Sequence, residues 1–581
     1  MRKGFLFTVL ACLLAARGNS AAPAWQKGDK GYSLAFGPGV ITCDSQGRLS
    51  VRPKGQPALE VGFFQWHDAY VFETLEAGKV EAAETGADGV LRLKGLWGAR
   101  DGSAPLRYEL ALAPSESGVS ARLEVAKTGA LKLCDGIWAT MRTPVAEKDS
   151  RLVYLLPTAD TPVGKAVEGA FKQAFIGAEG GPSLSFSGEG LCYLRSRVGN
   201  GGHGFEVKLA STRDFPAGDK LAVSLTLGFA TMPKVLRPAV TCAAPLALSA
   251  LAPSEVPLYG KCEIDVTLAG TWDNPYDPAQ IALDAAVTTA SGRTYLMPGF
   301  FMVRHRRESV GPDDLMLPEG LGQWKVRLAA TEPGPMRVTL TARDRSGTVT
   351  FALPMPVNVL ADAKAKGFVR VSPADAHYLA FDSGEGYFPI GHNVPIYHGS
   401  NSMSVKDILE KMAAHGENWN RWWMSKSGLG LEWGPKLGWY RQAQAATLDW
   451  LLEDAGRLGM YYQLCMDTHQ DFRTDGWKAN PFNAAQGGPC KTAGEWFTNE
   501  EAKALYRKRL RYTVARWGYS PHVLCWEFGN EFEGWADAKQ ETIIAWHREM
   551  APVLAALDPY GHLISTSWWS KTGPEACWQI P

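Results

Sequence analysis

A carboxyl group with aromatic residues on both sides in the sequence is the first candidate for chemistry in this chain. Glu531 follows Asn530 directly, and its neighbours in sequence include Trp526, Phe528, Phe532 and Trp535. An apolar, partly desolvated setting keeps a carboxyl group protonated, as a general acid requires. Cleavage of a glycosidic bond needs such an acid and a second, ionised carboxylate. Glu531 is therefore the leading candidate acid, and Glu527 and Glu533 are weaker alternatives.

Other polar residues lie where predicted strands end. Arg421, His469 and Asn393 each stand at or just past the carboxyl end of a different strand, and Asn530 and Glu531 follow a fourth. In a (β/α)8 barrel these ends share one face, which carries the chemistry. Trp423 and Trp568 are candidate platforms for stacking a sugar ring, although such residues also serve as core packing.

Arg421 and His469 each have an alternative interpretation that does not involve a substrate. Arg421 stands between Trp419 and the Trp422–Trp423 pair, so cation–π packing alone could account for it. His469 lies between Asp467 and Asp471, but a spacing of two at a strand end makes a weak set of metal ligands. We therefore predict no metal site and no cofactor.

The elements that must hold these residues alternate between strands and helices from about residue 368 onward. Predicted strands cover 387–395, 419–424, 460–466, 523–528 and 563–568, and predicted helices lie between them. One helix begins at Ser404, with Asp407 completing a capping box, and another begins at Thr498, with Glu501 in the same role. Such alternation implies a parallel sheet. The sequence ends at Pro581, so we expect roughly 90 further residues, or three strand–helix units, to complete a closed barrel.

The preceding residues read as β-structure. Residues 23–240 contain short alternating strands separated by turn residues, which is typical of a β-sandwich. Residues 241–360 form a second β unit whose length suits an immunoglobulin-like sandwich, with strands predicted at 262–267, 282–289, 324–329 and 336–342. The predicted fold is thus two all-β sandwich domains followed by a partial TIM-barrel domain at 361–581.

Composition narrows the class of partner. Lysine plus arginine number 60 and aspartate plus glutamate number 60, and this neutral balance argues against a nucleic-acid binder. Of the 21 tryptophans, 15 lie in residues 361–581, a density that indicates either core packing or a cleft whose flat apolar rings stack on sugars. We expect a carbohydrate partner, and the oligomeric state is left open.

The first 22 residues are predicted to be an export signal. Arg2 and Lys3 precede an apolar run from Phe5 to Ala16, and small residues follow at Ser20, Ala21 and Ala22. The run is too short to span a bilayer comfortably, so a secreted or periplasmic location without a membrane span is predicted. Export would permit disulfides, but Cys465 and Cys525 stand in apolar strand-like runs and are predicted to be free core thiols.

The run Trp526-Glu527-Phe528-Gly529-Asn530-Glu531 resembles the strand-four motif of clan A glycoside hydrolases, the cellulase-like and mannanase-like barrels near family 5. The resemblance implies that Asn530 binds the substrate 2-hydroxyl and that Glu531 is the general acid/base of a retaining, double-displacement mechanism. It further implies that Arg421 braces the nucleophile and that His469 lines the cleft. In that family the nucleophile is a glutamate on strand seven, which is expected beyond residue 581.

Residues 245–360 resemble the domain of unknown function 5060, which often precedes such barrels, whereas 23–240 resemble no family that we can name. Two functions from different classes follow. The first is a secreted glycoside hydrolase that degrades a β-linked polysaccharide or oligosaccharide. The alternative is a non-catalytic carbohydrate-binding protein built on an incomplete barrel.

Overall fold

The computed structural model describes residues 23–67, 71–98, 106–128, 133–156, 159–165, 167–189, 192–199, 201–210, 218, 220–233, 246–310, 313–394, 402–426, 428–434, 436–534 and 538–568. The predicted export signal lies outside the described residues. The chain divides into two compact units, one made of 1–156, 162–166 and 171–234, and the other of 157–161, 167–170 and 235–581. None of the helices in the described ranges is long and apolar enough to cross a membrane.

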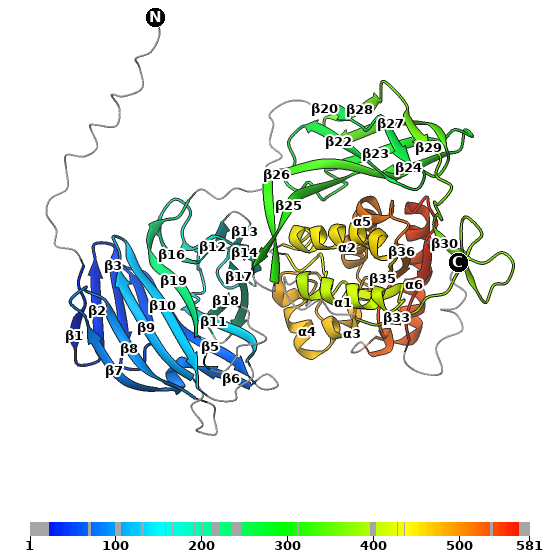
Figure 1. Ribbon diagram of the computed structural model, residues 1–581. Helices are drawn as coiled ribbons and strands as arrows, with labels where there is room; N and C mark the ends of the chain where they lie inside the picture. The colour runs from blue at the N-terminus through cyan, green and yellow to red at the C-terminus, as the bar shows by residue number, and fades with distance from the viewer. Residues whose placement is uncertain are drawn as a thin grey trace, which may run out of the picture. The chain divides into compact units, whose positions relative to one another are not determined.

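The first unit is built from two antiparallel sheets, shown in blue to cyan-green in Figure 1. One sheet has the order β1-β2-β3-β4-β5-β11-β18-β17, with β6 beside β5, and the other has the order β12-β15-β16-β19-β10-β9-β8-β7. Their bounds are β1 Gln26–Gly28, β2 Gly31–Phe36, β3 Gly39–Asp44, β4 Leu49–Pro53, β5 Leu59–His67, β6 Val71–Thr74, β7 Lys79–Thr85, β8 Leu91–Trp97, β9 Leu106–Pro114, β10 Gly118–Lys127, β11 Leu133–Pro144, β12 Leu152–Leu156, β15 Gln173–Gly177, β16 Pro182–Gly188, β17 Cys192–Gly199, β18 Gly202–Ala210 and β19 Lys220–Thr231. A 3-10 turn, η1, covers Leu75–Ala77, and two further short strands are β13 (Ala159–Pro162) and β14 (Glu168–Phe171).

Alternation of apolar and polar residues explains these sheets. Leu93, Leu110 and Leu123 lie directly opposite one another on β8, β9 and β10, and all three side chains are fully buried. Because the side chains of a strand point alternately to opposite faces, this register places one apolar face toward the core. The two sheets meet there, as the rings of Phe36 on β2 and Phe229 on β19 show at 5.7 Å between centroids.

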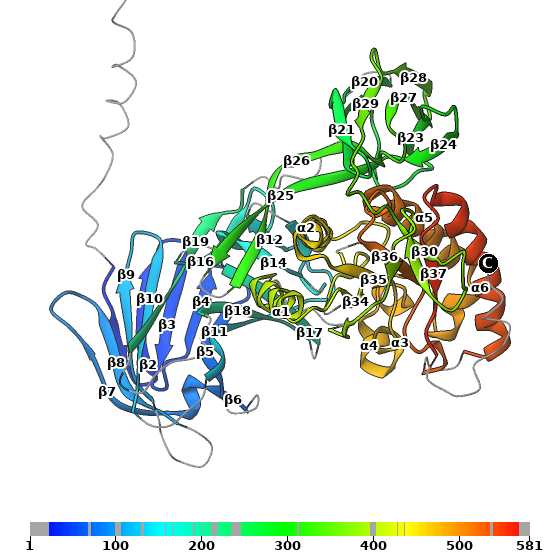
Figure 2. The same cartoon turned by 45° about the vertical axis from the view of Figure 1, so that its right-hand side comes forward.

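The second unit begins with two further sheets (green in Figures 1 and 2). One has the order β20-β22-β26-β25, and the other has the order β21-β29-β27-β23-β24, with β28 beside β27. Their bounds are β20 Ala247–Leu251, β21 Glu255–Pro257, β22 Lys261–Ala269, β23 Ile281–Thr288, β24 Thr294–Pro298, β25 Phe300–Val310, β26 Asp313–Ala329, β27 Gly334–Asp344, β28 Gly347–Ala352 and β29 Val357–Leu360. The four strands predicted in this region are thus present, and the prediction of a β-rich chain of several sheets is confirmed.

After a small antiparallel sheet, the chain alternates between parallel strands and helices. The small sheet consists of β30 Val369–Val371, β31 Leu379–Phe381 and β32 Gly386–Tyr387. The alternating part runs β33 Gly391–His392, α1 Ser402–Ala414, β34 Trp419–Trp423, α2 Gln442–Leu458, β35 Tyr461–Cys465, α3 His469–Phe472, α4 Thr474–Ala479, η2 Ala484–Gln486, η3 Gly494–Phe497, α5 Glu500–Trp517, β36 Val523–Glu527, η4 Phe532–Gly534, α6 Gln540–Leu557 and β37 Leu563–Ser565. The strands pair in parallel in the sequential order β33-β34-β35-β36-β37.

This order agrees with the predicted strand–helix alternation. Figure 2 shows the helices α1, α2, α5 and α6 beside the parallel strands. The described residues contain five parallel strands, so closure into an eight-stranded barrel stays a prediction. The division of 241–581 into two domains at residue 360 also stays a prediction, because the sandwich and the α/β part belong to one compact unit.

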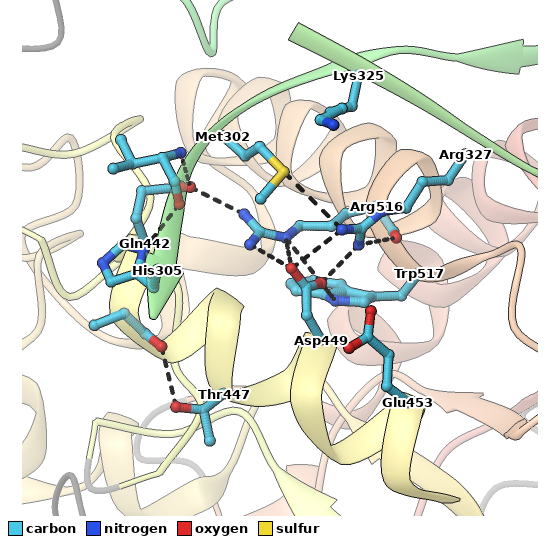
Figure 3. A network of polar contacts seen from close by, with 12 residues as sticks. Met302, His305, Lys325, Arg327, Gln442, Thr447, Asp449, Glu453, Arg516 and Trp517 are labelled. Carbon is cyan, nitrogen blue, oxygen red and sulfur yellow. Dashed lines mark hydrogen bonds and ion pairs between the residues drawn. The ribbon is translucent and has the colours of Figure 1, made fainter. Parts of the chain in front are cut away.

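A buried ionic network joins the sandwich of the second unit to its α/β part (Figure 3). Asp449 on α2 accepts hydrogen bonds from Arg327 of β26 at 2.7 Å, from Arg516 of α5 at 2.7 Å and from the indole of Trp517 at 2.8 Å. Burial alone would raise the pKa of Asp449, but the two guanidinium groups hold it well below its usual range. This carboxylate is therefore ionised, and it links three elements that lie far apart in the sequence.

Candidate active site

Arg421 and Glu527 form a buried ion pair across the parallel sheet. Arg421 lies on β34, and Glu527 is the last residue of β36, with β35 between them. The Nε of Arg421 donates to Glu527 Oε2 at 2.6 Å, and its Nη2 donates to Oε1. Gln463 of β35 donates to the same carboxylate at 2.8 Å. Burial would lower the pKa of Arg421, but the hydrogen bond and charge of Glu527 raise it above its usual value.

The same guanidinium group reaches the candidate site. Arg421 Nη2 donates to Asn530 Oδ1 at 2.9 Å and to the hydroxyl of Ser567 at 3.2 Å. Its carbon also lies 5.9 Å from the centre of the Trp423 ring, so the cation–π contact is present together with the polar contacts. Arg421 therefore ties the buried carboxylate of Glu527 to residues beyond the strand ends.

Backbone hydrogen bonds fix the segment that carries Asn530 and Glu531. The amide of Asn530 donates to the carbonyl of Asp467 at 2.9 Å, and the amide of His469 donates to the carbonyl of Asn530 at 3.2 Å. These bonds extend the parallel pairing of β35 and β36 by an isolated bridge between Thr468 and Asn530. Glu531 then adopts a left-handed backbone, with φ of 53°. A residue with a β-carbon pays for this conformation, and such outliers concentrate at functional sites.

His469 connects Asn530 with the carboxyl group of Glu531. Its Nδ1 accepts from the Asn530 side-chain amide at 2.7 Å and lies 3.3 Å from Glu531 Oε2. Burial lowers the pKa of His469, although the charge of Glu531 opposes this effect. A neutral ring with its lone pair on Nδ1 satisfies the bond from Asn530.

Exposure separates the three candidate carboxyl groups. The side chain of Glu531 is 38% exposed, whereas that of Glu527 is fully buried against Arg421. Glu533 lies in η4, and one of its carboxyl oxygens is buried. Glu531 is thus the carboxyl group that combines access to a substrate with contacts to the predicted site residues.

The structure brings Arg421, His469, Asn530 and Glu531 together, but it places the remaining predicted residues differently. Asn393 follows β33 and is exposed, and no described hydrogen bond joins it to this group. Trp423 is only 8% exposed and packs edge-on against the ring of His469, with centroids 5.9 Å apart. Trp568 is half-buried and packs against the core. Stacking of sugar on Trp423 or Trp568 stays a prediction.

The aspartates beside His469 face other partners. Asp467 forms a buried ion pair with Arg509, and Asp471 accepts a hydrogen bond from the backbone amide of Lys426 at 3.2 Å. Within the part of the chain that the structure describes, no group of three histidine, cysteine, aspartate or glutamate residues could hold a metal ion.

Sequence reasoning missed two polar residues of this cluster. Gln463 is the one polar residue in the strand Tyr461–Cys465, and that isolated polar position is the signal that could have identified it. Ser567 lies two residues beyond β37. The strand was predicted to cover 563–568, but in the structure it ends at Ser565. A serine near a strand end is too common in sequences to be singled out without the fold.

No protein-family model matches the chain. Over 172 residues it is 27% identical to mannan endo-1,4-beta-mannosidase 3 of Oryza sativa subsp. japonica. This alignment covers 28% of this chain and 36% of that protein. Over 220 residues it is 25% identical to mannan endo-1,4-beta-mannosidase A of Podospora anserina, covering 36% of this chain and 57% of that protein. The X-ray structure of the endo-beta-1,4-mannanase from Thermotoga petrophila is 22% identical, with a TM-score of 0.23 over 28% of this chain and 38% of that one.

The chain thus spans about a third to just over a half of the length of these curated relatives. Over that part it is homologous to glycoside hydrolases. The similarity to domain of unknown function 5060 is not among these findings and stays an expectation for residues 245–360.

Proposed function

We propose that this protein is a glycoside hydrolase that cleaves a β-linked polysaccharide, and that Glu531 is its general acid/base. The observation that carries the proposal is the accessible carboxyl group of Glu531 at a strand end, within 3.3 Å of His469 and beside the Arg421–Asn530 pair. The similarity to mannan endo-1,4-beta-mannosidases supports a β-1,4-mannan as the first substrate to test.

The proposed chemistry is a retaining double displacement. In the first step Glu531 gives its proton to the glycosidic oxygen while a carboxylate nucleophile attacks the anomeric carbon, which breaks the bond to the leaving sugar. In the second step Glu531 takes a proton from water, and that water displaces the nucleophile. Glu527 does not suit the nucleophile's role, because it is fully buried and paired with Arg421. Asn530 is proposed to bind the sugar 2-hydroxyl.

Export to the periplasm or the medium is part of the same proposal, since the substrate is a polymer and the first 22 residues have the pattern of a signal peptide. The alternative, a carbohydrate-binding protein without catalysis, would use the same residues but leave the polymer intact. The similarity to enzymes favours hydrolysis.

A panel of polysaccharides tests the proposal. The natural full-length protein is incubated with β-1,4-mannan, β-1,4-glucan, β-1,4-xylan and starch, and new reducing ends are measured. We expect release from a β-linked polymer, mannan before the others, and none from the α-linked starch. Retardation on a mannan affinity gel without any release of reducing ends would favour the binding protein instead.

A further inference from the structure

One hydroxyl group touches three of the residues in the candidate site. Ser567 follows β37 and is half-buried. Its Oγ accepts from the backbone amide of Glu531 at 3.1 Å and from Arg421 Nη2 at 3.2 Å, and it lies 3.4 Å from Asn530 Oδ1. The backbone of Ser567 is itself held, because its amide donates to the carbonyl of Gly529 at 3.1 Å.

The donors and acceptors around this hydroxyl determine its orientation. A serine hydroxyl has two lone pairs and one proton. The amide of Glu531 and the guanidinium of Arg421 occupy the lone pairs, so the proton points to Asn530 Oδ1. Asn530 must then present its oxygen to Ser567 and Arg421, and its amide nitrogen to His469 Nδ1. Arg421, which can only donate, fixes which way round the Asn530 amide lies, and the Ser567 hydroxyl supports that arrangement through a longer bond to the same oxygen.

The same hydroxyl supports the unusual backbone of Glu531. A φ of 53° is the left-handed region, which a residue with a β-carbon adopts only where its surroundings hold it. The hydrogen bond from the Glu531 amide to Ser567 Oγ provides that hold at the residue itself. A change in this backbone would move the carboxyl group away from His469 Nδ1, which is now 3.3 Å from Oε2.

We propose that Ser567 is a positioning residue: it holds the backbone of Glu531 and the side-chain amide of Asn530 in the arrangement that catalysis uses. The inference rests on the proposed function, since it assigns Ser567 a role in the reaction of Glu531. Ser567 acts through these two residues, and proton transfer itself stays with Glu531.

Three substitutions in the full-length protein test this role. Ser567→Ala removes the hydroxyl, Ser567→Cys keeps the size with only weak hydrogen bonding, and Ser567→Thr keeps the hydroxyl. Ser565→Ala is the matched control, because Ser565 lies two residues away and its hydroxyl bonds to the carbonyl of Thr566 and to the Cys525 thiol, while no described hydrogen bond joins it to Arg421, Asn530 or Glu531. Thermal unfolding of each variant shows which ones are folded.

We expect Ser567→Ala and Ser567→Cys to lower kcat on the polysaccharide by about 10- to 100-fold, as misplacement of a catalytic group does, with KM little changed. The loss should shrink on nitrophenyl glycosides, whose leaving groups need little protonation. Ser567→Thr should recover most of kcat. A merely structural serine would instead give equal losses on both substrates and no rescue by threonine.

Glu531→Gln, measured alongside, separates the two ideas. If Glu531→Gln is inactive while folded Ser567→Ala and Ser567→Cys match the wild type, the role of Ser567 is refuted and the proposed function stands. If the loss is equal on both substrates, the role of Ser567 is likewise refuted. If Glu531→Gln remains active on the polysaccharide, the proposed function fails and the role of Ser567 fails with it.

Discussion

Replacing Glu527 by glutamine should destabilise the second unit as well as impair the site. The carboxylate of Glu527 is fully buried and is the charge partner of Arg421, with Nε to Oε2 at 2.6 Å. Glutamine keeps the shape and one acceptor oxygen but leaves the guanidinium without its counter-charge. Breaking a buried ion pair in this way costs about 3–5 kcal/mol.

The expected shift in Tm follows from the size of the unit. Unfolding entropy is about 2.1 cal/mol/K per residue, so the 356 residues of this unit give about 0.7 kcal/mol/K. A loss of about 3–5 kcal/mol then lowers Tm by about 4–7 °C. Calorimetry of Glu527→Gln beside Glu541→Gln, an exposed glutamate in the first turn of α6, measures this difference. If both variants unfold within a degree of the wild type, the buried pair of Arg421 and Glu527 does not stabilise the second unit.

Three further outcomes are expected. Asp449→Asn should lower the free energy of unfolding by about 3–5 kcal/mol at neutral pH. Because folding lowers the pKa of Asp449, the difference between variant and wild type should shrink as the pH falls below about 4, the pKa of an unfolded aspartate. Denaturant unfolding at several pH values measures this difference. Asn499→Ala should cost about 0.5–2 kcal/mol in denaturant unfolding, since the Asn499 side chain caps α5 by accepting from Ala502 at 3.0 Å. Cys465 and Cys525 should resist alkylation until the protein unfolds, because burial raises the pKa of both thiols, and mass spectrometry of the labelled protein would expose early reaction.

The order of elements was predictable because it depends on local pattern. Alternating leucines predicted the β-sheets, and apolar residues at helical spacing predicted the helices between the parallel strands. The predicted free thiols Cys465 and Cys525 are confirmed as buried and unpaired. The grouping of Arg421, His469, Asn530 and Glu531 could be anticipated because the carboxyl ends of parallel strands share one edge. Their catalytic roles stay predictions.

Element boundaries were less predictable, because side chains distant in the sequence decide them. Residues 387–395 were expected to form one strand, but over the described residues 387–394 the structure has only the end of β32 (Gly386–Tyr387) and β33 (Gly391–His392). Between them the side chain of Asn418 bonds the amide of Ile390 at 2.9 Å and the carbonyl of Phe388 at 3.0 Å. Backbone groups satisfied in this way need no neighbouring strand.

The start of α5 shows a similar competition over one residue. Thr498 was predicted to cap this helix with Glu501, but the cap is Asn499, and the Thr498 hydroxyl bonds instead to the carbonyl of Glu495. Threonine and asparagine are both good capping residues, so two adjacent candidates cannot be separated by residue type. The role of Ser567 depends entirely on tertiary contacts, and no local pattern in the sequence reveals it.

The central claim, that Glu531 is the acid/base of a glycoside hydrolase, is tested most directly by the turnover of Glu531→Gln on mannan and on a nitrophenyl glycoside. Glutamine keeps the shape but cannot donate the proton, so release of reducing ends from the polysaccharide should fall by about 10²–10⁴-fold. The loss should be smaller on the nitrophenyl glycoside, and azide should partly restore its turnover by replacing the water that Glu531 activates. Glu541→Gln should match the wild type. Near-native activity of Glu531→Gln on mannan would contradict the assignment.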